Sequence, residues 1–214
     1  MPQVAIKICG VTTPAAIEAA ARGGASHIGL NYFPKSPRFL APDRVAPLVT
    51  SIPSHLKRVG VLVDPDDNLI DAMIAAGGMQ IIQLHGRETP ERTASLRQRT
   101  GLPVWKAIAV KTAADLASGA AYAGAVDFLL YDAKTPDGAV LPGGLGHRFD
   151  WSLLAGHRAP LPWGLSGGLD ASNVVEAIRV TSAPLVDVSS GVESAPGVKD
   201  IARIAAFCKA ALAS

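Results

Sequence analysis

The chain contains 214 residues with a formal net charge of +2, and 49% of its residues are hydrophobic. This length and composition suit one domain, residues 1–214, with a sizeable core. The near balance of charges and an aromatic content of 5% argue against a nucleic-acid-binding or membrane-binding surface, and no apolar stretch approaches the roughly 18 residues of a membrane span.

Short β-rich segments alternate with alanine-rich segments along the whole chain. The segments predicted as strands are 4–10, 26–33, 57–64, 79–86, 103–110, 126–133, 162–168 and 184–191. The segments predicted as helices are 13–22, 42–50, 65–76, 89–99, 112–119, 150–155, 171–180 and 198–212. Eight such units predict a single (β/α)8 TIM barrel. The alternative is an open doubly wound sheet, but the sequence ICGVTTP after the first strand is not the G-x-G-x-x-G turn usual in that fold.

Two of the predicted helices carry recognisable starts. Thr13 places a capping hydroxyl before Pro14, and proline is favoured at the first helical position. Asp170 is placed to cap the helix predicted from residue 171.

The two cysteines indicate the redox environment. Cys9 ends the first predicted strand and Cys208 lies in the last predicted helix, so we expect reduced thiols and a cytoplasmic protein. Lys7 interrupts the first apolar run, which is already too short for a signal peptide.

The first strand, VAIKICG, combines a lysine with a thiol. Side chains alternate along a strand, so Lys7 and Cys9 share a face, which we expect to point into the barrel. Strand eight neighbours strand one in a closed barrel, so Lys7 is predicted to pair with Asp187 beneath Cys9. A neighbouring ammonium is expected to lower the pKa of the Cys9 thiol and favour a thiolate base. The alternative is an ordinary buried cysteine.

Other polar residues also follow predicted strands, where a barrel places its catalytic groups. Asp132 ends strand six and the next helix begins far downstream, so it is better suited to donate a proton than to cap a helix. Arg38, in the proline-stiffened loop after strand two, is suited to a carboxylate, but this loop alone favours a solvated surface residue. His85 after strand four is either a substrate ligand or a core histidine.

Two glycine-rich turns, LSGGLD and VSSGVE, follow strands seven and eight. Many barrels bind phosphate at this place through backbone N–H groups and a helix start. Gly167 and Gly168 lack Cβ atoms, so an anion can approach the backbone closely. The second turn contributes Ser189, Ser190 and Gly191.

A base, an acid and a phosphate site together suggest isomerisation of a sugar phosphate, which moves protons and needs two positioned titrating groups. The sequence has no second His or Cys at metal-ligand spacing and no nucleotide-binding motif, so we expect neither a metal site nor a cofactor.

Several motifs resemble those of the phosphoribosylanthranilate isomerase family, in chain order from the first strand to the last helix. They are KICGVTTP, GLNYFPKSPR, GVLVD, QLHG, LLYDAKTP, a GG-x-G before FDW, LSGGL and VDVSSGVE. The resemblance implies an Amadori rearrangement of an aminoaldose to an aminoketose, a step of tryptophan biosynthesis.

The resemblance also implies roles for individual residues. Asp132 matches the general acid that opens the ribose ring, and Cys9 matches the general base that removes the C2′ proton. Arg38 matches the residue that holds the anthranilate carboxylate. The two glycine turns match the phosphate site, and His85 and Asp187 match residues that line the pocket.

One loop departs from the family pattern. After strand six the family has a threonine or serine between glycines and then a lysine, whereas this chain has Leu145 and then His147, so contacts of these two residues are not carried over.

Two related barrels are alternatives. One isomerises the histidine-pathway aminoaldose and needs a second phosphate site. The other, an indole-forming synthase, needs a lysine acid and a longer N-terminus. A non-enzymatic barrel would leave Cys9 and Asp132 unexplained. We expect a small phosphorylated substrate as partner and a monomer or homodimer.

Overall fold

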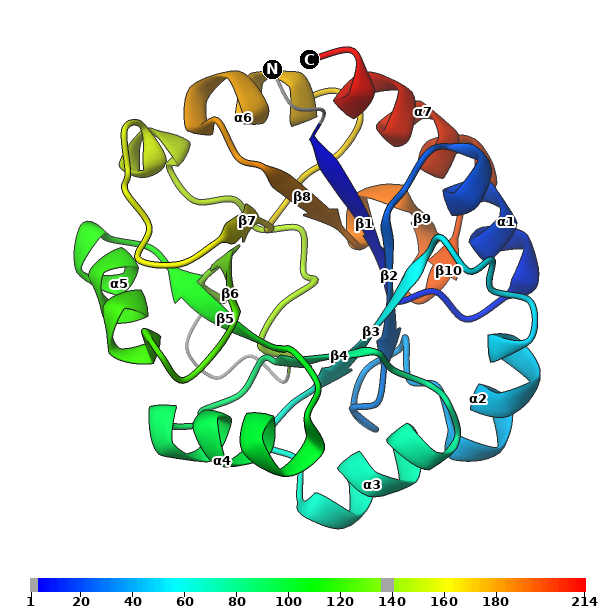
Figure 1. Cartoon of the computed structure of the whole chain (residues 1–214). Coiled ribbons are helices and arrows are strands. Elements are labelled where there is room, and N and C mark those ends of the chain that lie inside the picture. Colours follow the sequence, from blue (N-terminus) through cyan, green and yellow to red (C-terminus); the bar gives the residue numbers. More distant parts are fainter. Residues whose placement is uncertain (1–3, 136–140) are drawn as a thin grey trace.

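The computed structural model describes residues 4–135 and 141–214. Its central element is a closed barrel of eight strands in sequence order, and every neighbouring pair is parallel. Figure 1 shows the strands at the centre and helices around them. The predicted barrel is therefore confirmed. Pro136, the last residue of the LLYDAKTP motif, lies outside the described residues.

All eight predicted strands are present, and most end one to three residues inside the predicted limits. They are β1 (Ala5–Cys9), β2 (His27–Asn31), β3 (Lys57–Leu62), β4 (Ile81–Leu84), β5 (Val104–Val110), β6 (Phe128–Ala133), β7 (Trp163–Leu165) and β8 (Leu185–Val188). As a result His85 and Ser189 lie in the first positions after their strands.

The helices agree with the prediction except around β6 and β7. The α-helices are α1 (Pro14–Arg22), α2 (Pro42–Val49), α3 (Asp67–Ala75), α4 (Pro90–Thr100), α5 (Ala113–Ala117), α6 (Val174–Thr181) and α7 (Ile201–Leu212). The 3-10 helices are η1 (Ser118–Tyr122), η2 (Trp151–Leu154) and η3 (Ser190–Val192). The helix predicted at 150–155 is thus a 3-10 helix.

Local signals explain where two of these helices begin. The Thr13 side chain accepts a hydrogen bond from Ala16 N at 3.3 Å, so the predicted cap of α1 is confirmed. Asp170 does not cap α6, contrary to the prediction, because its carboxylate accepts from Ser172 N and Oγ within the loop. That loop uses three more residues, and α6 begins only after Asn173.

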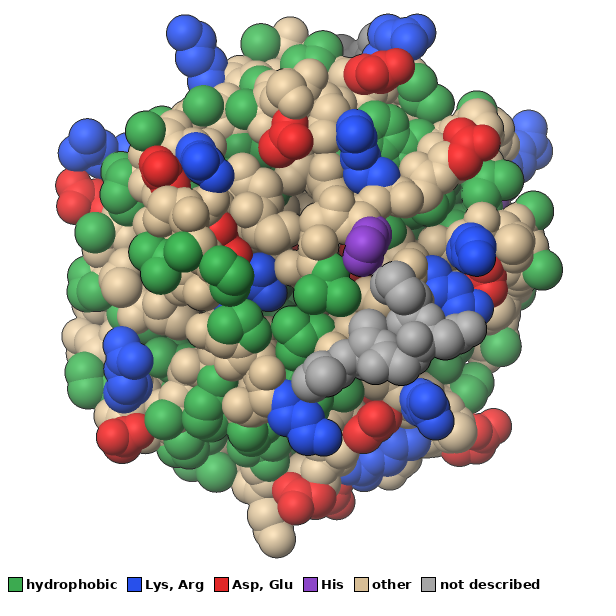
Figure 2. Space-filling view, turned by 180° about the vertical axis from the view of Figure 1, so that it is seen from behind, with side chains coloured by type: hydrophobic (Ala, Val, Ile, Leu, Met, Phe, Trp, Pro, Cys, Tyr) green, Lys and Arg blue, Asp and Glu red, His purple; other side chains and the backbone are tan. Residues whose placement is uncertain are grey.

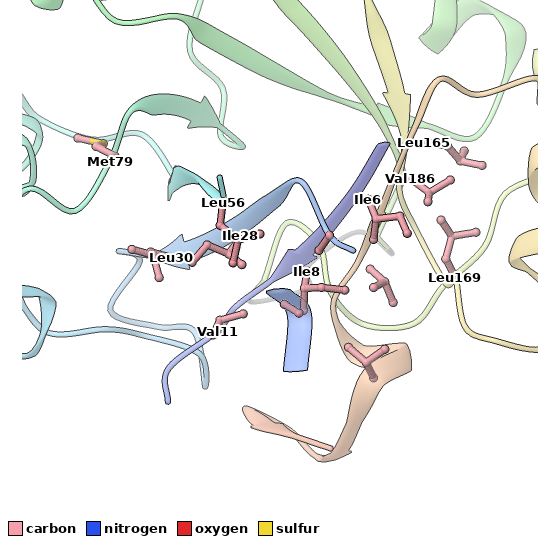
Figure 3. Close-up of a cluster of buried hydrophobic side chains, with 14 of the residues drawn as sticks. Ile6, Ile8, Val11, Ile28, Leu30, Leu56, Met79, Leu165, Leu169 and Val186 are labelled. Carbon is pink, nitrogen blue, oxygen red and sulfur yellow. The ribbon is translucent and has the colours of Figure 1, made fainter. Parts of the chain in front are cut away.

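The two faces of β1 have different environments. Ile6 and Ile8 belong to the apolar layer between the barrel and the helices, as predicted, and Figure 3 shows them with Leu165 and Val186. Lys7 is fully buried and lies opposite Asp187 in the register of β1 with β8. The inward face of this strand therefore carries the polar residues.

A second apolar cluster fills the amino-terminal end of the barrel. It consists of Val59, Ile81, Trp105, Leu130 and Leu185, with Ala5 and Phe128 packed against it. Each of these side chains lies near the start of its strand, so this cluster closes the barrel below the polar residues.

A short antiparallel hairpin, β9 (Glu193–Ala195) and β10 (Val198–Lys199), follows β8 and η3. It leads into α7, which packs beside α1 (Figure 1). Within the described residues, no helix is both long and apolar enough to cross a membrane.

Candidate active site

A cavity opens at the carboxyl ends of the barrel strands. Nine of the residues predicted for the site line it: Cys9, Arg38, His85, Asp132, Gly167, Gly168, Asp187, Ser189 and Ser190. Lys7 lies buried beneath it and Gly191 lies in the turn after β8. The face shown in Figure 2 carries interspersed acidic and basic side chains, as a nearly neutral chain predicts. The structure thus brings together residues that are far apart in the sequence.

Lys7 and Asp187 form the predicted ion pair inside the barrel. Lys7 Nζ donates to Asp187 Oδ1 at 3.0 Å and to Oδ2 at 2.9 Å. Burial alone would lower the pKa of Lys7, but the charge and hydrogen bonds of Asp187, with a smaller effect of Cys9, outweigh it and raise that pKa above its usual value. The lysine therefore remains an ammonium below the cavity.

The sequence predicts that Lys7 lowers the pKa of the Cys9 thiol below its usual value. That prediction is wrong, because the pKa of Cys9 is raised overall. Burial is the largest influence on Cys9 and raises its pKa, while the nearby charge of Lys7 lowers it by less. Asp187 adds a further rise and Lys199 a further fall. The thiol is therefore protonated at neutral pH, and Lys7 limits the rise that burial causes.

Asp132 and His85 meet at the cavity wall. Their Oδ2 and Nε2 atoms are 3.0 Å apart, and Asp132 Oδ1 accepts from Ala133 N at 2.9 Å. A Cβ atom at Gly143 would lie 2.6 Å from Asp132 Oδ2 and 2.9 Å from the His85 ring. Glycine is therefore required where this loop passes over the pair.

Arg38 is buried rather than solvated, with a relative exposure of 5%. Its Nε and Nη2 atoms donate to the two carboxylate oxygens of Glu193 at 2.7 and 2.8 Å, and Nη2 also donates to Gly144 O at 3.0 Å. Lys199 binds the same carboxylate at 2.7 Å. Burial alone would raise the pKa of Glu193, but the two cations hold it below its usual value. Burial in turn lowers the pKa of Lys199, and the charge of Glu193 opposes that fall. In this Arg38 cluster, Arg38 and Lys199 therefore share one buried carboxylate beside the cavity.

The two glycine turns lie side by side at the mouth of the barrel. Gly167 and Gly168 have φ angles of +93° and +62°, a region that side chains rarely adopt. A Cβ atom at Gly191 would collide with the carbonyl of Leu169, in the other turn. Lys199 Nζ donates to Ser189 O at 2.9 Å, and Ser189 Oγ donates to Cys9 O at 3.3 Å. The turn after β8 is therefore joined to the Arg38 cluster and to β1.

Comparison with known proteins identifies the family. A family model described as N-(5'-phosphoribosyl)anthranilate (PRA) isomerase matches residues 6–210. The N-(5'-phosphoribosyl)anthranilate isomerase of Paramagnetospirillum magneticum is 51% identical over 208 residues, which cover 97% of each chain. The chain belongs to the phosphoribosylanthranilate isomerase family.

Solved structures of phosphoribosylanthranilate isomerases have the same fold. The crystal structure of the isomerase from Thermotoga maritima has a TM-score of 0.88 at 34% identity, covering 99% of this chain and 100% of that one. Another structure, with a TM-score of 0.85, 32% identity and the same coverage, is an isomerase in complex with reduced 1-(o-carboxyphenylamino)-1-deoxyribulose 5-phosphate.

The loop that departs from the isomerase pattern folds over the cavity. Gly144 and Gly146 have φ angles of +73° and +77°, and Leu145 between them is 44% exposed although it lines the cavity. His147 also lines the cavity, and its carbonyl would lie 2.7 Å from a Cβ at Gly168. Leu145 therefore places an apolar side chain where the family pattern has a hydroxyl.

Sequence reasoning missed three residues of this site. Glu193 and Lys199 escaped notice because each alone is typical of an exposed hairpin, although Glu193 ends the quoted motif VDVSSGVE. Gln83 lines the cavity, and its buried Oε1 atom has no hydrogen-bond partner among the described residues. Its place two residues before His85, on the same inward face, was a signal that could have found it.

The described residues contain no group of three or more His, Cys, Asp and Glu side chains arranged to hold a metal ion. Ionisable groups at and below the cavity are instead joined to one another: Lys7 with Asp187, His85 with Asp132, and both Arg38 and Lys199 with Glu193. Such a site can donate and accept protons and can bind anions.

Proposed function

We propose that this chain converts N-(5-phosphoribosyl)anthranilate to 1-(2-carboxyphenylamino)-1-deoxyribulose 5-phosphate, in tryptophan biosynthesis, with Asp132 as general acid and Cys9 as general base. The observation that carries this proposal is that Asp132 and Cys9 line one cavity together with a buried arginine and two glycine turns. Family membership supports the reaction, and the cavity supports the assignment of residues.

The reaction begins with ring opening. Asp132 gives its proton to the ribose ring oxygen, the C1′–O bond breaks, and the anthranilate nitrogen supplies the electron pair that forms an iminium. Cys9, as thiolate, then removes the C2′ proton, and the electron pair of that C–H bond forms the enolamine. Tautomerisation to the ketone returns the protons, so the substrate and product are isomers and no cofactor is consumed.

The other residues bind the substrate. Arg38 lines the cavity and suits the anthranilate carboxylate. Its Nε and Nη2 atoms bind Glu193, so Nη1 is the atom proposed to donate a charge-assisted hydrogen bond to the substrate. The turns at 167–168 and 189–191 suit the phosphate, since glycines let an anion approach backbone N–H groups. The carboxyl end of β7 and β8 is also where barrels commonly hold phosphate. His85 and Asp187 complete the pocket around the reacting carbons, and Lys7 holds Asp187 from below.

The test is the loss of anthranilate fluorescence during turnover. Cys9→Ala and Asp132→Asn should each lower kcat by at least about 10²-fold, the usual range for removing a general acid or base. Both should still bind the reduced product analogue, because neither residue belongs to the carboxylate or phosphate contacts. Near-normal turnover in either variant, with the analogue still bound, would refute its assignment.

The remaining expectations accompany this proposal. The chain is expected to act as one domain, in the cytoplasm, as a monomer or homodimer and without a metal or cofactor. Sedimentation velocity distinguishes the two oligomeric states. If no metal is needed, turnover should be unchanged after dialysis against a chelator.

A further inference from the structure

A further buried ion pair lies on the outside of the barrel, away from the cavity. Glu88 and Lys106 have relative exposures of 5% and 3%, and Lys106 Nζ lies 3.0 Å from Glu88 Oε2. Lys106 points outward from β5, since its neighbour Trp105 belongs to the inward apolar cluster. Burying a charged pair costs free energy that burying an apolar pair of the same size would not. The groups that this pair contacts therefore indicate its role.

The pair binds the backbone on both sides of His85. Lys106 Nζ donates to Gly86 O at 2.8 Å and approaches Leu84 O at 3.4 Å. Gly86 N donates to the Glu88 carboxylate at 3.0 and 3.1 Å. The peptide groups before and after His85 are therefore held by charged groups, which form stronger hydrogen bonds than neutral ones.

The same carboxylate also holds the preceding loop. Asp64 N donates to Glu88 Oε1 at 2.8 Å, and Asp64 has a left-handed φ of +45°. Asp64 Oδ1 in turn accepts from Arg87 N at 2.6 Å. Together with the bond from His85 N to Leu62 O at 2.8 Å, these contacts fix the position of the His85 backbone relative to β3.

His85 transmits this position to the cavity. Its ring is 3.0 Å from Asp132, which belongs to β6 on the far side of β5. The contacts of Glu88 and Lys106 with the flanking backbone thus reach Asp132 through the His85 side chain. A shift of the backbone at residues 84–86 would move the ring and alter the position of the acid.

We propose that Glu88 and Lys106 are positioning residues that hold His85, and through it the general acid Asp132, in catalytic alignment. This inference rests on the function proposed above. It predicts an effect on the chemical step rather than on binding, because neither residue lines the cavity.

The experiment compares Lys106→Met and Glu88→Gln in wild-type and His85→Ala backgrounds, assayed by anthranilate fluorescence below the unfolding temperature of every variant. Lys106→Met should lower kcat about 10-fold to 100-fold, as misplacement of a catalytic group does, and change KM less than about threefold. Glu88→Gln keeps an oxygen acceptor and should show the smaller loss. In the His85→Ala background neither substitution should lower kcat further, because the effects of substitutions at coupled residues do not add.

Two controls separate positioning from general destabilisation. Arg97→Met removes a solvent-exposed pair with Asp127 at the amino-terminal end of β6 and should leave kcat unchanged. The imidazole ¹⁵N resonances of His85 should shift in Lys106→Met and stay unchanged in Arg97→Met. Should Lys106→Met fail to fold, Glu88→Gln provides the same comparisons.

Additive losses of kcat in the His85→Ala background, or unchanged His85 resonances, would overturn the inference. So would a rise in KM at constant kcat. Failure of the proposed acid is a separate result: Asp132→Asn would then keep its turnover, while the His85 resonances would still report whether the ion pair holds that ring.

Discussion

At the scale of single residues, the reactivity of Cys9 is decided by burial against charge. Burial raises the pKa of the thiol, Lys7 and Lys199 lower it, and Asp187 raises it. Because the thiolate is the base, kcat/KM is expected to increase as the pH rises above neutrality, as the fraction of thiolate increases. Carbamidomethylation by iodoacetamide, measured by mass spectrometry in a Cys208→Ala background, should increase over the same pH range.

The matched variant is Lys7→Met, which removes the charge that lowers the pKa of the Cys9 thiol most. In this variant, carbamidomethylation of Cys9 should increase at still higher pH than in the wild type. A Cys9 that is alkylated faster than a free cysteine at neutral pH would contradict the raised pKa, and an unchanged pH dependence in Lys7→Met would contradict the effect of Lys7.

Arg38 gives a second prediction at this scale. Arg38→Ala should raise KM for the substrate, by about 10-fold or more, because it removes a buried charge-assisted contact with the carboxylate. Lys199→Met should raise KM less, since it leaves the guanidinium in place. A phosphoribosyl analogue without the carboxylate should bind Arg38→Ala and wild type alike, and a large difference in its affinity would contradict the contact.

At the scale of elements, the glycine turns are predicted to bind phosphate through their backbone conformation. Gly168→Ala places a Cβ at a φ of +62°, against the carbonyls of His147 and Gly146. It should raise KM for the phosphorylated substrate and lower the free energy of unfolding by about 1 kcal/mol. Gly101→Ala is the control, because Gly101 has a φ of +67°, lies at the end of α4, and has no atom of the described residues within 4 Å of its Cβ position. It should destabilise the protein without changing KM, and equal KM values for the two variants would contradict the phosphate site.

The elements also show how far sequence alone leads. The strands were predictable because parallel strands covered by helices are apolar on both faces. The inward face of β1 was predictable because it carries the polar side chains of this strand. The α1 start was predictable because Thr13 and Pro14 act within one turn. The α6 start was not, because Asp170 has competing local partners and only the folded loop decides between them.

The predicted site residues gather at one cavity for the same topological reason, since the strand ends meet there. Their partners were less accessible to sequence reasoning. Arg38 and Glu193 are 155 positions apart, and each alone is typical of a solvated surface. The net pKa of Cys9 was also out of reach, because the degree of burial depends on the packing of every strand around it.

At the scale of the whole molecule, the barrel separates catalytic groups from groups that stabilise the fold. The amino-terminal end is closed by the apolar cluster around Trp105, and His27 lies beside it with its ring centroid 5.2 Å from that of Trp105. His27 Nδ1 is 2.8 Å from Ser26 Oγ, and in the strand register His27 lies opposite Lys7 and Lys57. Burial and these two ammonium groups lower the pKa of His27 from 6.5 to about 4.

This shift makes the stability of the whole barrel dependent on pH. Between about pH 6.5 and about pH 4 the unfolded chain binds a proton that folded His27 does not, so the free energy of unfolding falls as the pH falls. The contribution of this one group is roughly 1–2 kcal/mol at pH 5, after allowance for its partial exposure. Urea unfolding at pH 7 and pH 5 should show a smaller loss of stability in His27→Gln than in wild type, whereas His55→Gln, at an exposed loop position, should behave as wild type. An equal loss in His27→Gln and wild type would mean that His27 carries its proton in the folded barrel.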